Sequence, residues 1–376
     1  MEEIVFLLAL NRIMNYDCRR AAALIEYAGS ASALFSMNGS ELADTLGKRY
    51  GFICELTNGS HLKWAEDELK WANSKGVSIL TPYDLSGGYP QYLFECNDRP
   101  IILYKIGPAD LNTRHIISMV GTRRSTRYGE QTCVKILDEM RELGLSPTVV
   151  SGLAFGIDIC AHRAAIRNDF ATVAVSACGP EKIYPVSHLA DARKIARTGA
   201  IITEFPRGVQ GLKLNFLRRN RIIAGISQAT IVIESSEKGG AMITASLAHS
   251  YSREVFALPG KVSDSASAGC NSLISKNIAN IISSTQDLVD KLGWRESVSI
   301  KKRVGRKEGT DILPEINFEN SYKEKILVTL GLGSELHIDE LSNMIGLSIS
   351  SISTTLLELE IDGKVMRLPG ERYTLM

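Results

Sequence analysis

The sequence lacks the features that mark membrane, disulfide-bonded and zinc-binding proteins. None of its apolar runs approaches the ~20 residues that span a bilayer. Its first residues carry Glu2 and Glu3 where a signal peptide has positive charge. The seven cysteines are scattered without any C-x-x-C pair, which is typical of reduced thiols rather than a disulfide framework. We therefore expect a cytoplasmic protein with no membrane contact and no metal site.

Sequence motifs for nucleotide binding and nucleophilic catalysis are also missing. Neither G-x-G-x-x-G nor G-x-x-x-x-G-K-[ST] occurs, so no cofactor is expected from this pattern. No G-x-S-x-G elbow is present, and no catalytic residue is assigned. Asp158 and His162 are spaced i, i+4, but they lack a third partner for a metal, and a structural role is favoured.

The near-zero net charge of the chain hides a strong asymmetry along it. The whole chain has 43 Lys and Arg against 42 Asp and Glu, whereas residues 113–260 alone have 19 basic and 12 acidic side chains. Residues 1–112 and 319–376 each have a net charge of −4. This segregation indicates a middle region that faces a polyanion, although a fluctuation on a solvated surface would give the same numbers.

The sequence before residue 295 falls into two parts with different patterns of apolar residues. The first ~70 residues predict short helices, with apolar positions at helical spacing from Ile4 to Ile13 and from Ala21 to Tyr27. After Val77, short runs of Val, Ile and Ala alternate with helical patterns, as in strands buried on both faces of a mostly parallel, doubly wound sheet. The runs are 101–105, 115–120, 148–151, 171–176, 200–204, 229–234, 254–259 and 280–284.

The end of the chain predicts a linker and a small separate unit. Residues 295–318 are basic and poor in apolar side chains, as in a solvated linker. Three helical stretches follow (322–330, 338–345 and 350–361), and a hairpin is predicted to turn at Pro369–Gly370. Three helices with a terminal hairpin are the pattern of a winged helix.

Glycines and arginines gather where predicted strands end. The runs VGTRRSTRYG and SGLAFGID each pass from a strand through a glycine turn, at Gly121 and Gly152, into a helix. Backbone N–H groups at such turns form anion-binding nests, and Arg123 and Arg124 add charge to the first. A glycine turn also serves packing alone, and the residues leave both interpretations open.

A third element, NFLRRNRIIAGIS, places three arginines at the predicted opening of a helix. Arg218, Arg219 and Arg221 would there oppose the helix dipole, which favours an anion at that position. Phe216 and Tyr184 add aromatic faces. Arginines interleaved with aromatic side chains are typical of proteins that hold single-stranded nucleic acid, with charge for phosphates and rings for bases.

These motifs together resemble one family. VGTRRSTRYG, VSGLAFGIDICAHRAAI, IYP, TEFP, FLRRNRIIAGIS, GGAMITA and REVFALPG, in this order, look like the DNA-processing protein DprA (Smf) family of bacteria. The resemblance implies an extended Rossmann-like doubly wound sheet with an N-terminal helical SAM-like domain and a C-terminal winged-helix domain. The implied domains are 1–75 (SAM-like), 76–294 (Rossmann-like), 295–318 (linker) and 319–376 (winged helix).

The resemblance also implies a function. Members bind single-stranded DNA entering a competent cell, protect it and load the RecA recombinase in natural transformation, usually as homodimers and without catalysis. The residues that it assigns to DNA contact are Gly121, Arg123, Arg124, Gly152, Phe155, Tyr184, Arg218, Arg219 and Arg221. The winged helix is net acidic and its third helix offers Ser, Thr and Glu, so a protein contact is favoured over groove binding.

Two other functions remain open at this level. The first is a nucleotide phosphoribohydrolase on a related sheet, whose P-G-G-x-G-T-x-x-E motif is broken here by Lys238 and Leu247, so that the acid is missing. The second is an adaptor whose arginines pair with acids such as Glu204 and Glu234. Binding of short oligodeoxynucleotides separates the adaptor from the single-stranded DNA binder, and release of free base from nucleoside monophosphates would indicate the phosphoribohydrolase.

Overall fold

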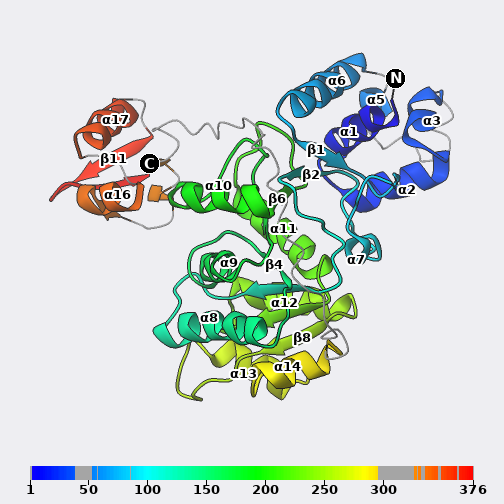
Figure 1. Ribbon diagram of the computed structural model, residues 1–376. Helices are drawn as coiled ribbons and strands as arrows, with labels where there is room; N and C mark the ends of the chain where they lie inside the picture. Colours follow the sequence, from blue (N-terminus) through cyan, green and yellow to red (C-terminus); the bar gives the residue numbers. More distant parts are fainter. Residues whose placement is uncertain are drawn as a thin grey trace.

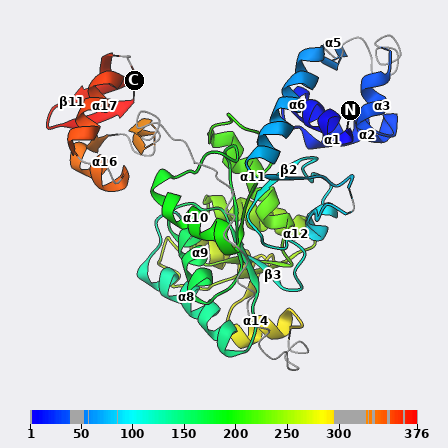
Figure 2. The same ribbon diagram turned by 45° about the horizontal axis from the view of Figure 1, so that its top comes forward.

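The computed structural model describes residues 2–38, 53–56, 58–84, 86–294, 326–327, 329–331, 335–345, 349–361 and 364–375. A helical N-terminal part, a central sheet flanked by helices and a small C-terminal unit follow one another along the chain (Figures 1 and 2). Among the described residues, no helix is both long enough and apolar enough to pass through a bilayer. The predicted linker at 295–318 lies outside the described residues.

The N-terminal part is built from short capped helices. Asp17 accepts a hydrogen bond from the N–H of Arg20, and Ser30 accepts one from the N–H of Ala33, so that each caps the helix that follows it. The helices predicted from Ile4 and from Ala21 are confirmed, the second beginning three residues earlier. The described helices here are α1 (Glu3–Ile13), α2 (Cys18–Ala28), α3 (Ala31–Ser36), α5 (Ile53–Leu56) and α6 (Gly59–Ser74).

The central sheet has nine strands in the order β1-β2-β6-β5-β4-β3-β7-β8-β9. The seven strands from β6 to β9 in this order pair in parallel, whereas β2 pairs antiparallel with β6 and β1 antiparallel with β2. All eight predicted runs contain strands, and β1 is an addition. The strands are β1 (Ser78–Leu80), β2 (Leu103–Ile106), β3 (Ile116–Val120), β4 (Thr148–Ser151), β5 (Thr172–Val175), β6 (Ala200–Thr203), β7 (Ala229–Val232), β8 (Glu254–Ala257) and β9 (Asn280–Ile281).

Helices cover both faces of the sheet, which explains the continuous apolar runs. In β3, Ile116 and Val120 belong to one buried cluster with Ile222 of α11, whereas Ile117 and Met119 belong to another that includes side chains of α8 and α9. The helices of this part are α7 (Gln91–Phe94), α8 (Arg127–Glu142), α9 (Ile157–Arg167), α10 (Leu189–Thr198), α11 (Lys213–Gly225), α12 (Gly240–Ser250), α13 (Ala268–Ser275) and α14 (Thr285–Lys291), with a 3₁₀ turn at Val186–His188.

The strand order reverses between β3 and β7. From β3 the chain moves outward through β4, β5 and β6, and it then returns to place β7, β8 and β9 on the other side of β3. Loops that leave the carboxyl ends of strands on the two sides of such a reversal diverge and leave a crevice between them. A ligand site is therefore expected beyond Val120 and Val232, the last residues of these two strands.

The C-terminal unit has the expected winged-helix elements. Its three-stranded sheet has the order β10-β12-β11, and β11 and β12 form the predicted hairpin, with Gly370 in the turn at φ 79°. The helix predicted at 322–330 lies partly outside the described residues. The described elements are β10 (Leu336–His337), α16 (Ile338–Ile345), α17 (Ile349–Ile361), β11 (Val365–Leu368) and β12 (Arg372–Leu375).

Candidate nucleic-acid interface

A cavity of about 580 Å³ opens at the carboxyl edge of the sheet, where the strand order reverses. We call it the switch-point cavity. Its wall includes Gly121 and Arg123 after β3, Ser235 and Ser236 after β7, and the first residue of α12, Gly240. Its residues come from helix α11 and from several loops, which meet because parallel strands end at the same edge.

The loop that carries Arg123 and Arg124 is held by a buried carboxylate. Glu234 is fully buried and accepts hydrogen bonds from both the N–H (2.9 Å) and the hydroxyl of Thr126. The N–H of Thr122 donates to the Glu234 carbonyl at 2.7 Å, and the Thr126 hydroxyl caps α8 by accepting from Gly129. Both arginines are exposed on a loop whose backbone is fixed from two sides.

Glycine is required at two positions of the neighbouring β4–α9 loop. Gly156 has φ +74°, and a Cβ there would lie 2.2 Å from the carbonyl oxygen of Thr122. At Gly152 a Cβ would collide with the guanidinium of Arg219. The glycine spacing of SGLAFGID therefore serves close packing between the two loops and makes room for an arginine.

Arg219 projects into the switch-point cavity from α11 and is only partly compensated. It is 3% exposed, its Nη1 lies 4.0 Å from Oδ2 of Asp158, and its Nε has no hydrogen-bond partner. Burial, opposed by Arg219, raises the pKa of Asp158, and burial, opposed by Asp158, lowers the pKa of Arg219. The cavity therefore holds a buried cation with unused donor capacity.

Aromatic rings lie beside these cations. The rings of Tyr184 and Phe216 meet at 5.1 Å between centroids, and both line the cavity. The guanidinium of Arg123 lies 5.4 Å from the Phe216 ring centroid, and that of Arg219 lies 5.9 Å from it. Phe216 therefore lies within cation–π distance of arginines from two different elements.

A second cavity, of about 590 Å³, adjoins the first and shares Arg123 with it. We call it the arginine cavity. Arg124 and Phe155 line it together with Arg163 and Arg167 of α9. The last two are already paired, Arg163 with Asp191 at 2.8 Å and Arg167 with Asp138. Arg123 and Arg124 are therefore the arginines of this wall without such an acidic partner among the described residues.

The predicted contact residues fall into three groups. Gly121, Arg123, Tyr184 and Arg219 line the switch-point cavity, and Arg124 and Phe155 line the arginine cavity. Gly152 lies beneath Arg219. Arg218 and Arg221 line neither cavity. The structure thus gathers six of the nine residues at one edge of the sheet.

The prediction that three arginines stand at the opening of a helix is wrong. Helix α11 begins at Lys213, so Arg218, Arg219 and Arg221 lie in its middle. No proline interrupts Lys213–Asn220, and the helix starts as soon as the chain has passed Gly211. The argument from the helix dipole therefore does not apply, and the case for an anion depends on the cavity instead.

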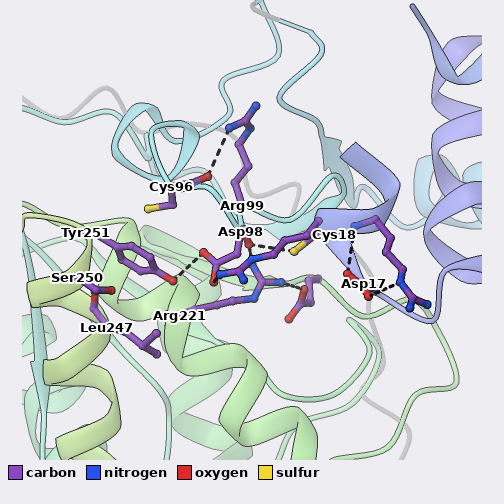
Figure 3. Close-up of polar contacts among 12 residues, drawn as sticks. Asp17, Cys18, Cys96, Asp98, Arg99, Arg221, Leu247, Ser250 and Tyr251 are labelled. Atoms are coloured by element: carbon purple, nitrogen blue, oxygen red, sulfur yellow. Dashed lines mark hydrogen bonds and ion pairs between the residues drawn. The ribbon is translucent and has the colours of Figure 1, made fainter. Parts of the chain in front are cut away.

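Arg221 belongs to a polar cluster that joins the N-terminal part to the sheet (Figure 3). It is ion-paired with Glu204, which is itself 3% exposed, and donates to the carbonyl oxygen of Asp98. The same carbonyl accepts from the thiol of Cys18 at 3.1 Å, and the Asp98 carboxylate accepts from Tyr251 at 2.7 Å. Both terminal nitrogens of Arg221 therefore have partners within the protein. The pairing of an arginine with Glu204 is what the adaptor hypothesis expected.

Arg218 makes a similar contact nearby. Its Nη1 donates to the carbonyl oxygen of Asn15, in the turn between α1 and α2, at 3.2 Å. The aromatic rings of Tyr16 and Phe205 meet at 5.4 Å beside it. One face of α11 therefore holds the helical domain, while another presents Arg219 to the cavity.

Sequence reasoning missed several residues of the switch-point cavity. Lys213 and Asn220 lie on α11 outside the arginine run, and Ser236 precedes the glycine pair of the next loop. Asp158 was interpreted as structural, and it does hold the loop by accepting from the backbone N–H of Gly152 and Ala154. The sequence position of Asp158, four residues before His162, did not indicate that its charged partner is Arg219.

Comparison with known proteins identifies the family. A family profile described as DNA recombination-mediator protein A matches residues 79–293, and one described as the DprA winged helix domain matches residues 321–371. The chain belongs to the DNA recombination-mediator protein A family. The family resemblance inferred from the motifs and the mixed α/β fold with its C-terminal winged helix are both confirmed.

Relatives cover most of the chain. Protein Smf of Synechocystis sp. is 33% identical over 325 residues, which are 80% of this chain and 80% of the relative. Protein Smf of Escherichia coli is 30% identical over 319 residues, 82% of this chain and 80% of the relative. DNA processing protein DprA of Streptococcus pneumoniae is 35% identical over 201 residues, 54% of this chain and 70% of the relative.

Two solved structures share this fold. The crystal structure of DprA from Streptococcus pneumoniae is similar with a TM-score of 0.64 at 29% identity, over 75% of this chain and 95% of the other. DNA processing protein A from Helicobacter pylori has a TM-score of 0.51 at 30% identity, over 57% of this chain and 95% of the other. The latter structure is described as one of a single-stranded DNA binding mode.

Proposed function

We propose that this protein binds single-stranded DNA at the carboxyl edge of its sheet and mediates recombination. In this proposal it protects incoming DNA and loads the RecA recombinase onto it during natural transformation, as a cytoplasmic homodimer and without catalysis. Membership of the recombination-mediator family supports the general role. The single-stranded DNA binding mode of the related Helicobacter pylori protein supports the ligand.

The observation that carries the proposal is the juxtaposition of two arginines with Phe216. Arg123 and Arg219 reach this ring from different elements at the rim of the switch-point cavity. Cations bind phosphates whatever the sequence, and an aromatic face stacks on any base. This combination suits a flexible strand with exposed bases better than a duplex, whose bases are already stacked.

Each predicted contact residue then has a proposed part. Arg123 and Arg124 would bind successive phosphates, since they lie on one loop and line adjoining cavities. Tyr184 and Phe155 would offer ring faces to bases, Tyr184 in the switch-point cavity and Phe155 in the arginine cavity. Gly121 and Gly152 would serve through close packing rather than by direct contact, and Arg218 and Arg221 would act through the helical domain.

The arrangement favours binding over hydrolysis. Among the described residues that line the switch-point cavity, Asp158 is the one carboxylate, and Arg219 and two backbone N–H groups already engage it. Leu247 on α12 stands where the phosphoribohydrolase motif has its acid. A general acid or base for glycosidic cleavage would therefore have to come from elsewhere.

The winged helix is proposed to contact protein rather than DNA. It is net acidic, and helix α17 exposes Ile349 at 49% and Leu357 at 59%. Exposed aliphatic side chains on an acidic unit suit a protein partner better than a polyanion.

The test is fluorescence anisotropy of a labelled deoxythymidine oligonucleotide over a series of salt concentrations. Each phosphate neutralised contributes a slope of ~0.7 in log K against log salt for single strands. Arg123→Ala should weaken binding and lower the slope by about that amount. The matched control is Arg141→Ala, which removes an exposed arginine near the opposite end of α8.

Three results would contradict the proposal: no binding by the unaltered protein, an unchanged slope in Arg123→Ala, or an equal loss in Arg141→Ala. The last would assign binding to net charge rather than to this site.

A further inference from the structure

Two cysteine thiols meet where helices α8 and α9 pack against each other. Cys133 of α8 is fully buried, and Cys160 of α9 lies against the same helix, with its Sγ 3.6 Å from the carbonyl oxygen of Glu130. Glu130 precedes Cys133 by three residues, and residues three apart share one face of a helix. The Cys133 thiol donates a hydrogen bond to the sulfur of Cys160. The two sulfur atoms are therefore in contact across the helix interface.

The packing of these helices favours a covalent link between the two sulfurs. The buried cluster that contains Cys133 includes three small side chains of α9, namely Ala161, Ala164 and Ala165. Small side chains at a contact let two helix axes approach closely. A disulfide needs Cα atoms about 4.4–6.8 Å apart, which only closely packed backbones provide. Closure then requires the thiols to move from contact to bonding distance, without a rearrangement of the helices.

The two thiols differ in their access to solvent. Cys160 is partly exposed and lines the arginine cavity together with Arg163 and Arg167. Cys133 is 0% exposed and lies behind Cys160, in the core between the helix and the sheet. A small oxidant that enters the cavity therefore reaches Cys160 first, and Cys133 is placed to react with the product.

The surroundings of Cys160 favour its thiolate, which is the reactive form of cysteine. The hydrogen bond from Cys133, together with the charges of Arg163 and Arg167, lowers the pKa of Cys160 against the effect of burial. Burial raises the pKa of four other thiols, those of Cys18, Cys96, Cys178 and Cys270. An accessible thiol with a favoured thiolate beside a second thiol is the arrangement found in redox-sensing pairs.

We propose that Cys160 and Cys133 are a peroxide-sensitive thiol pair that closes reversibly into a disulfide between α9 and α8. These helices directly follow the loops that carry Phe155 and Arg123, so the oxidised chain has a covalent link between the two segments that line the arginine cavity. The inference goes beyond the proposed function and does not depend on it, because the reaction needs no DNA.

The oxidant is hydrogen peroxide, and the reaction has two steps. The Cys160 thiolate attacks one peroxide oxygen and the O–O bond breaks, so that Cys160 becomes a sulfenic acid and the peroxide is reduced. The hydroxide that leaves takes up the proton that Cys160 had lost. The Cys133 sulfur then attacks the Cys160 sulfur, the S–O bond breaks, and the leaving hydroxide takes the Cys133 proton. One peroxide therefore converts two thiols into one disulfide and two water molecules.

The experiment treats the reduced full chain with one equivalent of hydrogen peroxide, blocks the remaining thiols and maps the tryptic peptides by mass spectrometry. We expect a disulfide between peptides 128–135 and 142–163, which carry Cys133 and Cys160, and its loss after dithiothreitol. The exposed Cys54 should be oxidised at least ~10-fold less at this dose, because Cys160 has a favoured thiolate and an adjacent second thiol.

The variant Cys133→Ala separates the parts of the two cysteines. Without the second thiol, the sulfenic acid of Cys160 should persist and be captured by dimedone, whereas it should not accumulate in the unaltered chain. The matched control is Cys270→Ala, which removes another fully buried thiol, on α13, and should leave the yield of the disulfide unchanged.

Three results would overturn the inference: no oxidation of Cys160, oxidation of Cys160 that gives no disulfide with Cys133 in the unaltered chain, or equal oxidation of Cys54 and Cys160. The peptide map of the unaltered chain gives all three, whether or not a variant folds. Failure of an oligonucleotide to bind would contradict the proposed function and leave the thiol pair as it is.

Discussion

Two arginines on one helix, Arg219 and Arg221, show how alike residues come to serve different ends. Both are nearly buried, and they are two positions apart. Arg221 meets the Glu204 carboxylate and the Asp98 carbonyl, whereas Arg219 meets Asp158 at 4.0 Å and keeps an unpartnered Nε. A buried cation with full partners stabilises the fold, whereas one with partial partners in a cavity wall leaves positive charge only partly compensated beside that cavity.

The largest effect should come from breaking the buried ion pair between Arg221 and Glu204. Arg221→Ala leaves Glu204 as an uncompensated buried charge and removes a contact of the Asp98 cluster. We expect unfolding in urea to show a loss of ~3–5 kcal/mol. Arg218→Ala, which removes an arginine with one exposed carbonyl contact, should change stability by less than ~0.5 kcal/mol. Equal losses in both variants would mean that Arg221 contributes no more to stability than Arg218 does.

The pair of Arg219 and Asp158 should respond differently to the loss of its arginine. Arg219→Met keeps much of the buried volume but removes the charge, and its partner Asp158 already has a raised pKa and can take up a proton. We expect a stability loss of ~1–3 kcal/mol, below that of Arg221→Ala, and a fall in oligonucleotide affinity of at least ~10-fold. Full affinity in this variant would place the bound strand away from the switch-point cavity.

A second incompletely partnered buried group, His162, predicts a pH dependence. Its Nδ1 contacts the Thr172 hydroxyl at 2.7 Å, its Nε2 has no partner, and burial, with the nearby His188, lowers its pKa to about 3. His162 therefore stays neutral in the folded state at pH values below about 6.5, where the unfolded chain takes up a proton. The contribution of neutral His162 to the free energy of unfolding is complete above this pH and is lost as the pH falls towards 3.

The measurement is the free energy of unfolding between about pH 6.5 and 4.5. The His162→Asn variant, whose amide can still donate to Thr172, should reduce the slope by up to ~1.4 kcal/mol per pH unit. His249→Asn, at an exposed position of α12, should leave it as it is. A slope that His162→Asn leaves unaltered would mean that another group titrates here.

The smallest effect concerns the loop that presents Arg123. Thr126→Val removes the α8 cap and a hydrogen bond to Glu234, at a cost of ~1–2 kcal/mol, and loosens the loop so that oligonucleotide binding weakens. Ser284→Ala removes the analogous cap of α14, far along the chain from this loop. It should cost similar stability with no effect on binding. A binding loss in both variants would tie affinity to general stability.

The sequence predicted the sheet well because its signal is local. Strands buried on both faces need continuous apolar runs, and those at 115–120 and 229–234 contain β3 and β7. The hairpin at Pro369–Gly370 was equally visible, since its turn needs a residue with positive φ. The antiparallel edge strand β1 was missed because three residues give no periodicity to detect.

The site was predictable in its motifs and not in its partners. The glycine turns at Gly121 and Gly152 marked the correct edge of the sheet, because strand ends are readable in the sequence. Arg221 could not be separated from Arg219 there, since its carbonyl partner Asp98 lies 123 positions away and only the tertiary fold brings it near. The same holds for the bond between Thr126 and Glu234, 108 positions apart.

The most direct test of the central claim is hydrogen exchange of the full chain with and without a deoxythymidine oligonucleotide. Binding at the carboxyl edge predicts slower exchange in the loop at 121–126 and in the segments 211–217 and 236–241, which lead into α11 and α12, and little change in α14 or in the winged helix. Protection confined to residues 335–375, with these three segments exchanging as before, would contradict the assignment of DNA binding to this edge of the sheet.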